Sequence, residues 1–140
     1  MRIDECVAQG LLKKMSPDKG MAMNSVRAAE HKLGIAKREM QAKIYENAVI
    51  SAYTSMFHAA RAILYRDGFK ERSHYAISVY LKEKYGEKIE KRFVYTLDTL
   101  RSERHEIMYG LNEPLEISAE EAKDAILTAA DFVEAVKKMI

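Results

Sequence analysis

Apolar residues recur at intervals of three and four along most of the chain, which is the spacing of an amphipathic helix. This pattern predicts helices at about 2–15, 17–40, 45–68, 74–85, 89–110 and from 118 onward. Alternation of Val, Ile and Thr with period two does not occur in the sequence, so no strand is predicted, and residues 69–72 are expected to form a loop. The sequence therefore predicts an all-α, up-and-down bundle of about five to six helices in one domain, residues 1–140.

Residues that cap or interrupt helices mark where these helices begin and end. They are Ser16 as a cap with Pro17 at the first helical position, Asp67 with Gly68, Ser73, Gly86, Asn112, Pro114, and Ser118 with Glu121 in a capping box. Small residues in the third helix, among them Ala52, Ala59 and Ala60, would let a neighbouring helix approach closely.

Composition limits the kind of partner that the chain binds. The 140 residues are 48% apolar and 31% charged, which is typical of a single globular domain. The net charge is +2, from 23 basic and 21 acidic residues. This balance is too even for a protein that coats nucleic acid through charge alone. Any contact with nucleic acid is therefore expected at a local site.

The remaining composition argues against several classes of site. One cysteine, Cys6, excludes an internal disulfide and a metal site built on several cysteines. We expect a reduced, cytoplasmic setting, with neither a signal peptide nor a membrane-spanning helix. The four histidines are scattered over four segments, and the sequence has no Gly-rich phosphate loop. We therefore expect no metal and no cofactor.

The fifth predicted helix has a charged residue in its apolar stripe. The stripe consists of Phe93, Leu97, Leu100, Arg104, Ile107 and Leu111, spaced by three and four. An arginine buried there without a partner would cost several kcal/mol. We therefore expect Arg104 to have an acidic partner, to open into a cleft or to face a second subunit. Glu30, Glu39 and Glu46 are candidate partners within the chain.

A helical wheel places three further polar residues beside Arg104. Arg101, His105 and Tyr109 share one edge of the helix with it. Guanidinium groups bind phosphate oxygens, imidazole transfers protons near neutral pH, and a phenol stacks or donates a hydrogen bond. The edge is therefore suited to a phosphodiester. Taken singly, each of these three residues also fits a solvated helix face or the rim of a core.

Three segments together resemble HEPN-domain proteins over about residues 45–111. They are "NAVISAYTSMFHAARAILYRDGF", "SHYAISVYLKEKYG" and "LRSERHEIMYGL". They match a family pattern of roughly A-Y-Y-A-M-F-H-A-A-R-A-L-L, then a His in the following turn, then R-x-x-R-x-x-A-D-Y-G. His74 matches that His, and Arg101 and Arg104 match the two arginines. The resemblance implies a helical bundle that forms a symmetric dimer.

The resemblance also implies a function. Many HEPN proteins are metal-independent RNA endonucleases, often toxins, paired with a minimal nucleotidyltransferase that acts as antitoxin or partner. On the hypothesis of an RNA-cleaving dimer, Arg104, His105 and Tyr109 are the candidate catalytic residues, and Arg101, Arg104 and His74 are the candidate substrate-binding residues. Active members carry an Arg followed, after four to six residues, by a His. In this chain Tyr109 stands at the place of that His.

Two other interpretations stay open. In the first, the chain is a non-catalytic module that binds a nucleotide or the nucleotidyltransferase, and Tyr109 is the acceptor for nucleotide transfer. In the second, the fifth helix is a dimer interface, and Arg104 pairs across the two-fold axis with an acidic residue such as Asp98. His74 also fits a capping or turn role beside Ser73. His58 is expected to be solvated.

Overall fold

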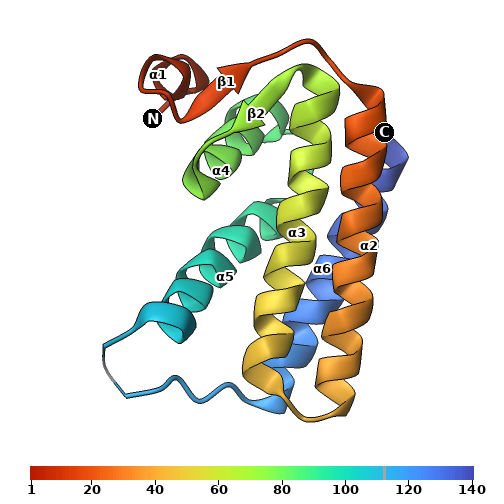
Figure 1. Cartoon of the computed structure of the whole chain (residues 1–140), viewed down its shortest axis with the longest axis vertical. Helices are drawn as coiled ribbons and strands as arrows, with labels where there is room; N and C mark the ends of the chain where they lie inside the picture. Colours follow the sequence, from red (N-terminus) through yellow and green to blue (C-terminus); the bar gives the residue numbers. More distant parts are fainter. Residues whose placement is uncertain (112) are drawn as a thin grey trace.

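The computed structural model is a set of helices with one small two-stranded sheet at one end (Figure 1), and it describes residues 1–111 and 113–140. The elements are α1 (Ile3–Ala8), β1 (Leu12–Lys14), α2 (Lys19–Gln41), α3 (Tyr45–Asp67), β2 (Phe69–Glu71), α4 (His74–Tyr85), α5 (Lys91–Tyr109) and α6 (Ala119–Met139). The prediction of an all-α bundle is confirmed, and the short sheet beside α1 and α4 adds to it.

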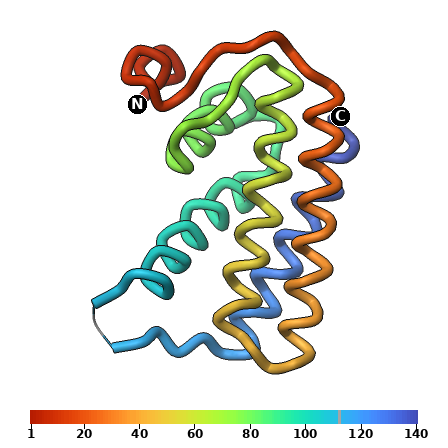
Figure 2. The backbone as a smooth tube through the Cα atoms, viewed as in Figure 1, coloured from red at the N-terminus to blue at the C-terminus, as the bar shows by residue number. Residues whose placement is uncertain are grey.

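Helices α2, α3 and α6 lie alongside one another and form the main bundle (Figures 1 and 2). The contact between α2 and α3 is close because small residues line it: Ala29, Ala52 and Ala59 are fully buried. Two hydroxyls bridge the helices, Ser25 to the carbonyl of His58 at 2.6 Å and Ser55 to the carbonyl of Ala29 at 2.7 Å. This is the close approach that the small residues of the third helix predicted.

The segment before α2 differs from the prediction. Helix α2 begins at Lys19, and Asp18 caps it by accepting a hydrogen bond from the backbone N–H of Met21 at 2.9 Å. The backbone N–H groups of Met15 and Asp18 donate to the carbonyls of Gly68 and Tyr65, each at 2.9 Å. These bonds hold residues 15–18 against the end of α3. Ser16 and Pro17 therefore precede the helix instead of starting it.

The prediction of one helix over 2–15, and of a loop over 69–72, is wrong. Helix α1 ends at Ala8, and Leu12–Lys14 pairs antiparallel with Phe69–Glu71, with Leu12 opposite Glu71. Strands of three residues are too short to give a recognisable period-two pattern. Gly68 joins α3 to this sheet with φ +92°, and a Cβ there would lie 2.7 Å from the carbonyl oxygen of Met15. That position therefore requires glycine.

Helix α5 belongs to the core only in its first half. Phe93, Val94, Leu97 and Leu100 are buried, and Figure 1 shows α5 sloping away from the bundle towards its C-terminal end. Leu111 is fully exposed. The apolar stripe is thus not a continuous core stripe, because Arg104 and Ile107 are only half-buried and Leu111 is exposed. Asn112, predicted to close the helix, lies outside the described residues.

The other predicted boundaries are close to the observed ones. Ser73 occupies the cap position of α4 with extended backbone, but its side chain makes no capping hydrogen bond. Ser118 does cap α6, accepting from the N–H of Glu121 at 3.1 Å. In the described part of the chain, no helix has the length and the apolar character needed to cross a membrane.

Candidate functional site

Five side chains from three helices meet where α4 begins and α5 leaves the bundle. They are Tyr53 and Phe57 of α3, His74 of α4, and Arg101 and Arg104 of α5. We refer to these five residues as the arginine–histidine cluster. His74 reaches it because the β2 strand turns back after α3 and starts α4 beside it.

The imidazole of His74 is held on two sides. It stacks on Phe57 with the ring centroids 4.1 Å apart, and its Nδ1 lies 2.6 Å from the hydroxyl oxygen of Tyr53. Tyr53 is 2% exposed, and its hydroxyl has no other hydrogen-bond partner among the described residues. A buried hydroxyl needs an acceptor, so Tyr53 donates to Nδ1. His74 then carries its proton on Nε2, which is a donor.

Aromatic faces support both arginines of the cluster. The guanidinium carbon of Arg104 lies 5.9 Å from the centre of the Tyr53 ring, and that of Arg101 lies 5.5 Å from the centre of the Tyr75 ring. These distances are within the range of cation–π attraction. The aromatic contacts hold both planar groups in place, and they leave the N–H donors of Arg104 for a ligand.

Arg104 has no ion pair among residues 1–111 and 113–140. In particular it pairs with none of the glutamates predicted as its partners, and Glu30 pairs instead with Lys137. Arg104 is half-buried and lies over Tyr53, where α5 leaves the core. Arg104 therefore has no acidic partner within the described part of the chain, and its settings in a cleft or against a second subunit stay predictions.

Carboxylates near the cluster are fewer than cations. Asp98 lies 3.4 Å from an Nη of Arg101 and 2.9 Å from Nζ of Lys82, and Glu71 lies 3.0 Å from Nε of Arg61. Three cationic side chains are thus paired with two carboxylates, and Arg104 is a fourth cation without one among the described residues. The Nη1 donor of Arg101 is buried and has no partner within the described ranges. A positive site with an unpaired donor is suited to an anion.

Burial is the main cause of the pKa shifts in the cluster; the arginine charges add to it for His74 and oppose it for Tyr53. Burial, followed by the charges of Arg104, Arg101 and Arg61, lowers the pKa of His74 below its ordinary 6.5. Burial raises the pKa of Tyr53 to about 12. Both groups are therefore neutral at pH 7, and His74 acts as a hydrogen-bond donor through Nε2–H.

The predicted site residues fall into two groups. Arg101, Arg104 and His74 come together in the cluster, whereas His105 and Tyr109 lie farther along α5 on its exposed side. The rings of His105 and Tyr109 contact each other, with centroids 5.3 Å apart, and Tyr109 is 59% exposed. Asp98, the proposed partner of Arg104 across a two-fold axis, is already paired within the chain.

Sequence reasoning missed the aromatic side of the cluster. Tyr53, Phe57 and Arg61 follow one another at intervals of four on α3, which places them on one face of a helix. Arg61 lies 5.2 Å from the centre of the Phe57 ring and donates to the hydroxyl of Tyr65. The arginine at the end of this row could have indicated the site, because a charged residue on an aromatic helix face shows that the face is not packed wholly within the hydrophobic core.

The structure corrects the prediction that was made for His58. His58 is half-buried beside Phe57, and burial lowers its pKa, so it is not a simply solvated residue. Within residues 1–111 and 113–140, no group of three or more His, Cys, Asp or Glu side chains is placed to hold a metal ion.

Comparison with known proteins identifies the family. Residues 22–139 match the model of the HEPN domain. A protein of Methanocaldococcus jannaschii named "Putative toxin MJ0605" is 30% identical to this chain over 120 residues, which cover 82% of this chain and 85% of that protein. The matched region contains all of α3, α4, α5 and α6, and therefore the whole arginine–histidine cluster. The chain is a member of the HEPN family.

Proposed function

We propose that this HEPN chain is an RNA-directed toxin that cleaves RNA without a metal ion, as a homodimer paired with a minimal nucleotidyltransferase in the cytoplasm. The observation that carries the proposal is the arginine–histidine cluster, where two guanidinium groups and the neutral imidazole of His74 are close together with few carboxylates. The name of the relative from Methanocaldococcus jannaschii supports the toxin role.

A phosphate group fits the donors that the cluster presents. Arg104 supplies charge-assisted hydrogen bonds, and Arg101 does so through the part of its guanidinium group that is exposed. Nε2–H of His74 supplies a neutral one. These donors stabilise the additional negative charge that develops on the phosphoryl oxygens in the transition state.

The reaction that fits these groups is transesterification at phosphorus. The 2′-oxygen forms a bond to phosphorus, and the bond from phosphorus to the 5′-oxygen breaks. The 2′-hydroxyl gives up its proton, for which His105 is the candidate base, and the departing 5′-oxygen takes up a proton from water. The products are a 2′,3′-cyclic phosphate and a 5′-hydroxyl. DNA lacks the 2′-hydroxyl and should resist cleavage.

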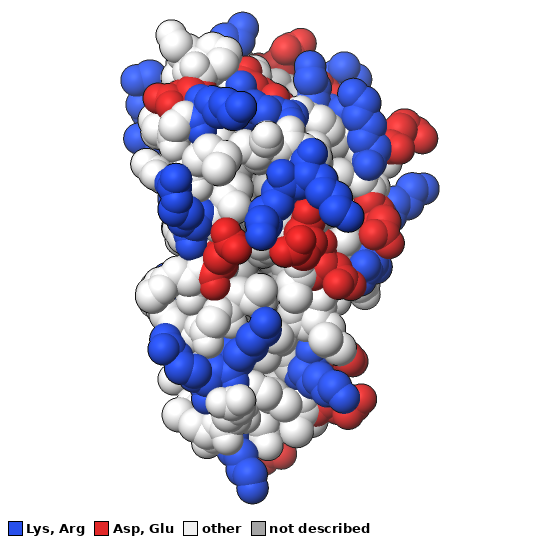
Figure 3. All heavy atoms as spheres, turned by 90° about the vertical axis from the view of Figure 1, so that its right-hand side faces the viewer, with Lys and Arg blue, Asp and Glu red and all other residues white. Residues whose placement is uncertain are grey.

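The charge distribution is that of a local site. Figure 3 shows the face over α2 and α6, where Lys and Arg side chains are interspersed with Asp and Glu. That face offers no uniform basic patch for a nucleic-acid backbone. The net charge of +2 is likewise too small for RNA binding through overall charge alone.

Cleavage of a mixed RNA pool with EDTA present tests the proposal. The wild-type chain should cleave, Arg104→Ala should lose most of the activity, and Arg27→Ala should keep it. Arg27 is an exposed arginine of α2, so the control makes the same change in net charge. Equal activity in the wild-type chain and Arg104→Ala would refute the proposed role of the cluster.

A second candidate function follows from the exposure of Tyr109. Its ring is 59% exposed near the end of α5, which suits an acceptor for nucleotide transfer by the nucleotidyltransferase. Mass spectrometry of the chain co-expressed with that enzyme should then show the added mass of a nucleotide. The addition should be absent in Tyr109→Phe and present in Tyr95→Phe, another exposed tyrosine of α5. An unmodified wild-type chain would contradict this function.

A further inference from the structure

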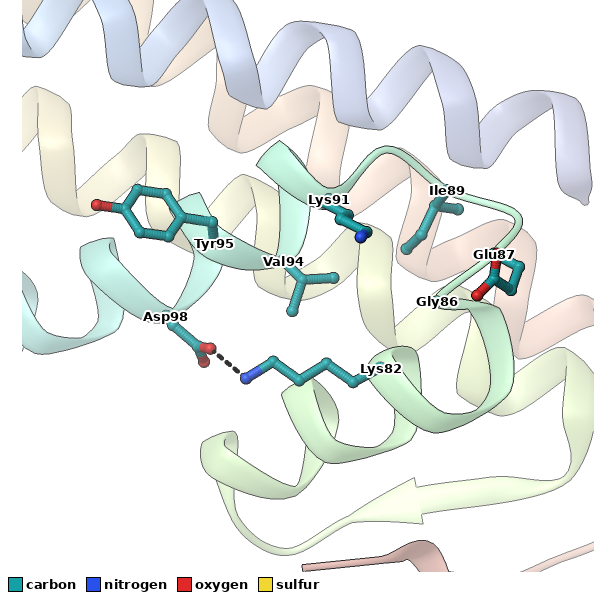
Figure 4. A pocket seen from close by; sticks show the side chains of 8 residues that line it. All are labelled: Lys82, Gly86, Glu87, Ile89, Lys91, Val94, Tyr95 and Asp98. Atoms are coloured by element: carbon teal, nitrogen blue, oxygen red, sulfur yellow. Dashed lines mark hydrogen bonds and ion pairs between the residues drawn. The ribbon is translucent and has the colours of Figure 1, made fainter.

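A cavity lies between the end of α4 and the first half of α5 (Figure 4). Its volume is about 440 Å³, within the range of small-ligand pockets. It is lined by Lys82, Gly86, Glu87, Ile89, Lys91, Val94, Tyr95 and Asp98. Neither the phosphate chemistry nor the predicted site residues make use of this α4–α5 cavity.

The walls of the cavity are suited to a flat apolar group. Figure 4 shows Ile89 and Val94 on one side of the space and the extended Lys82 side chain on the other. Tyr95 stands at the rim and is 73% exposed, so most of its ring is left in water. A planar ligand that stacked on Tyr95 and covered Ile89 and the methylene chain of Lys82 would remove exposed apolar surface from water.

One edge of the cavity offers a donor beside an acceptor. Nζ of Lys82 donates to Asp98 at 2.9 Å, which leaves the ammonium group further N–H donors and the carboxylate oxygen a further lone pair. Each of the four RNA bases has an adjacent donor and acceptor on its Watson–Crick edge. A nucleobase is therefore the planar ligand that both the walls and this edge fit.

Asp98 connects the cavity with the arginine–histidine cluster. One of its carboxylate oxygens faces Lys82 in the cavity, and the other lies 3.4 Å from Arg101. Tyr95 and Arg101 are six residues apart on α5, or about 9 Å along the helix axis. Six residues also turn the side chain by about 120° around the helix, so the separation of the two side chains exceeds this axial rise.

We propose that the α4–α5 cavity receives one unstacked base of the RNA whose phosphate binds at the arginine–histidine cluster. The inference rests on the proposed function for the identity of the ligand. The contribution of a stacked base to binding is sequence-tolerant. Any preference for one base over another then comes from its hydrogen bonds with Lys82 and Asp98.

Nucleosides test the cavity separately from the phosphate site, because they carry no phosphate. The measurement is methyl NMR of the whole chain titrated with adenosine, guanosine, cytidine and uridine. At least one nucleoside should shift the Val94 and Ile89 methyl signals in a saturable way. Tyr95→Ala should weaken its binding about tenfold, in line with the loss of one stacking contact. Leu127→Ala, which truncates an exposed apolar residue of α6, should leave binding unchanged.

Two results would overturn the inference: no nucleoside shifts these methyl signals, or binding is unchanged in Tyr95→Ala. Neither depends on RNA cleavage, so a failure of the nuclease proposal would show itself separately, in the EDTA assay. The link between the sites is tested with the 3′- and 5′-monophosphates of the bound nucleoside. One of them should bind more tightly than the nucleoside, and Arg104→Ala should remove that gain. Equal affinities in the wild-type chain would overturn the link.

Discussion

Replacing Tyr53 with Phe tests the orientation that we assign to His74. The substitution removes one hydroxyl and keeps the ring on which Arg104 lies and which fills the core at 2% exposure. It therefore deletes the 2.6 Å hydrogen bond to Nδ1 of His74 with little change in packing. Because that bond stabilises only the neutral imidazole, its loss should raise the pKa of His74 towards the ordinary value.

The expected loss of stability is that of one hydrogen bond. A net contribution of about 0.5–1.5 kcal/mol is typical, which for a domain of this size lowers Tm by roughly 2–5 °C. Tyr45→Phe is the matched control, since Tyr45 lies at the start of α3, partly buried, and its hydroxyl has no partner in the described hydrogen bonds. It should change neither the Tm nor the pKa of His74.

The assay is ¹⁵N NMR of the histidine rings across a pH titration. In the wild-type chain, His74 should show an unprotonated Nδ1 and a protonated Nε2 when neutral, with a pKa below 6.5. In Tyr53→Phe the pKa should rise and the Nδ1 signal should move. A proton on Nδ1 of the wild-type chain, or an unchanged pKa in Tyr53→Phe, would refute the assignment of His74 as an Nε2–H donor.

Two further predictions concern stability. The pKa values of His74 and His58 are lowered from 6.5, mainly by burial, so the unfolded chain takes up protons near pH 6.5 that the folded chain does not. The free energy of unfolding should therefore be highest above pH 6.5 and decrease as the pH falls below it. Urea titrations at several pH values measure this dependence. In His74→Gln the dependence on pH should become weaker, and an unchanged dependence would contradict the prediction. Gly68→Ala should cost at least about 1–2 kcal/mol, because φ is +92° and the new Cβ would meet the carbonyl of Met15. Thermal melts measure this cost, with Gly34→Ala as the control. At position 34 a Cβ meets nothing within 4 Å, so a small gain in stability is expected. Equal changes in Tm for the two variants would be inconsistent with strain at position 68.

The helices were predictable because their apolar spacing is long and regular. α3 and α6 occupy nearly the predicted ranges, and the family resemblance placed His74 and the two arginines at one site. The small sheet was not predictable, since Leu12–Lys14 and Phe69–Glu71 are too short for a pattern, and only their pairing across the fold makes them strands.

The burial of Arg104 could not be predicted from the local sequence, because it depends on how α5 packs against the other helices. Spacing placed Arg104 within a buried stripe, but burial requires a neighbouring element along the whole stripe. α5 leaves the bundle after Leu100, so Arg104 is half-buried and Leu111 is in water. The four residues that the helical wheel placed on one edge of α5 therefore separate into two pairs. Arg101 and Arg104 face His74, and His105 with Tyr109 lies outside.

The central claim is that the arginine–histidine cluster binds a phosphate of single-stranded RNA. The most direct measurement is the affinity for a 2′-O-methyl RNA strand, which resists cleavage, over a series of salt concentrations. For a single strand, each phosphate contact contributes about −0.7 to the slope of log K against log salt. Arg104→Ala should bind more weakly, with a slope shallower by about 0.7, whereas Arg27→Ala should match the wild-type chain. Equal affinities and slopes for Arg104→Ala and Arg27→Ala would contradict the claim.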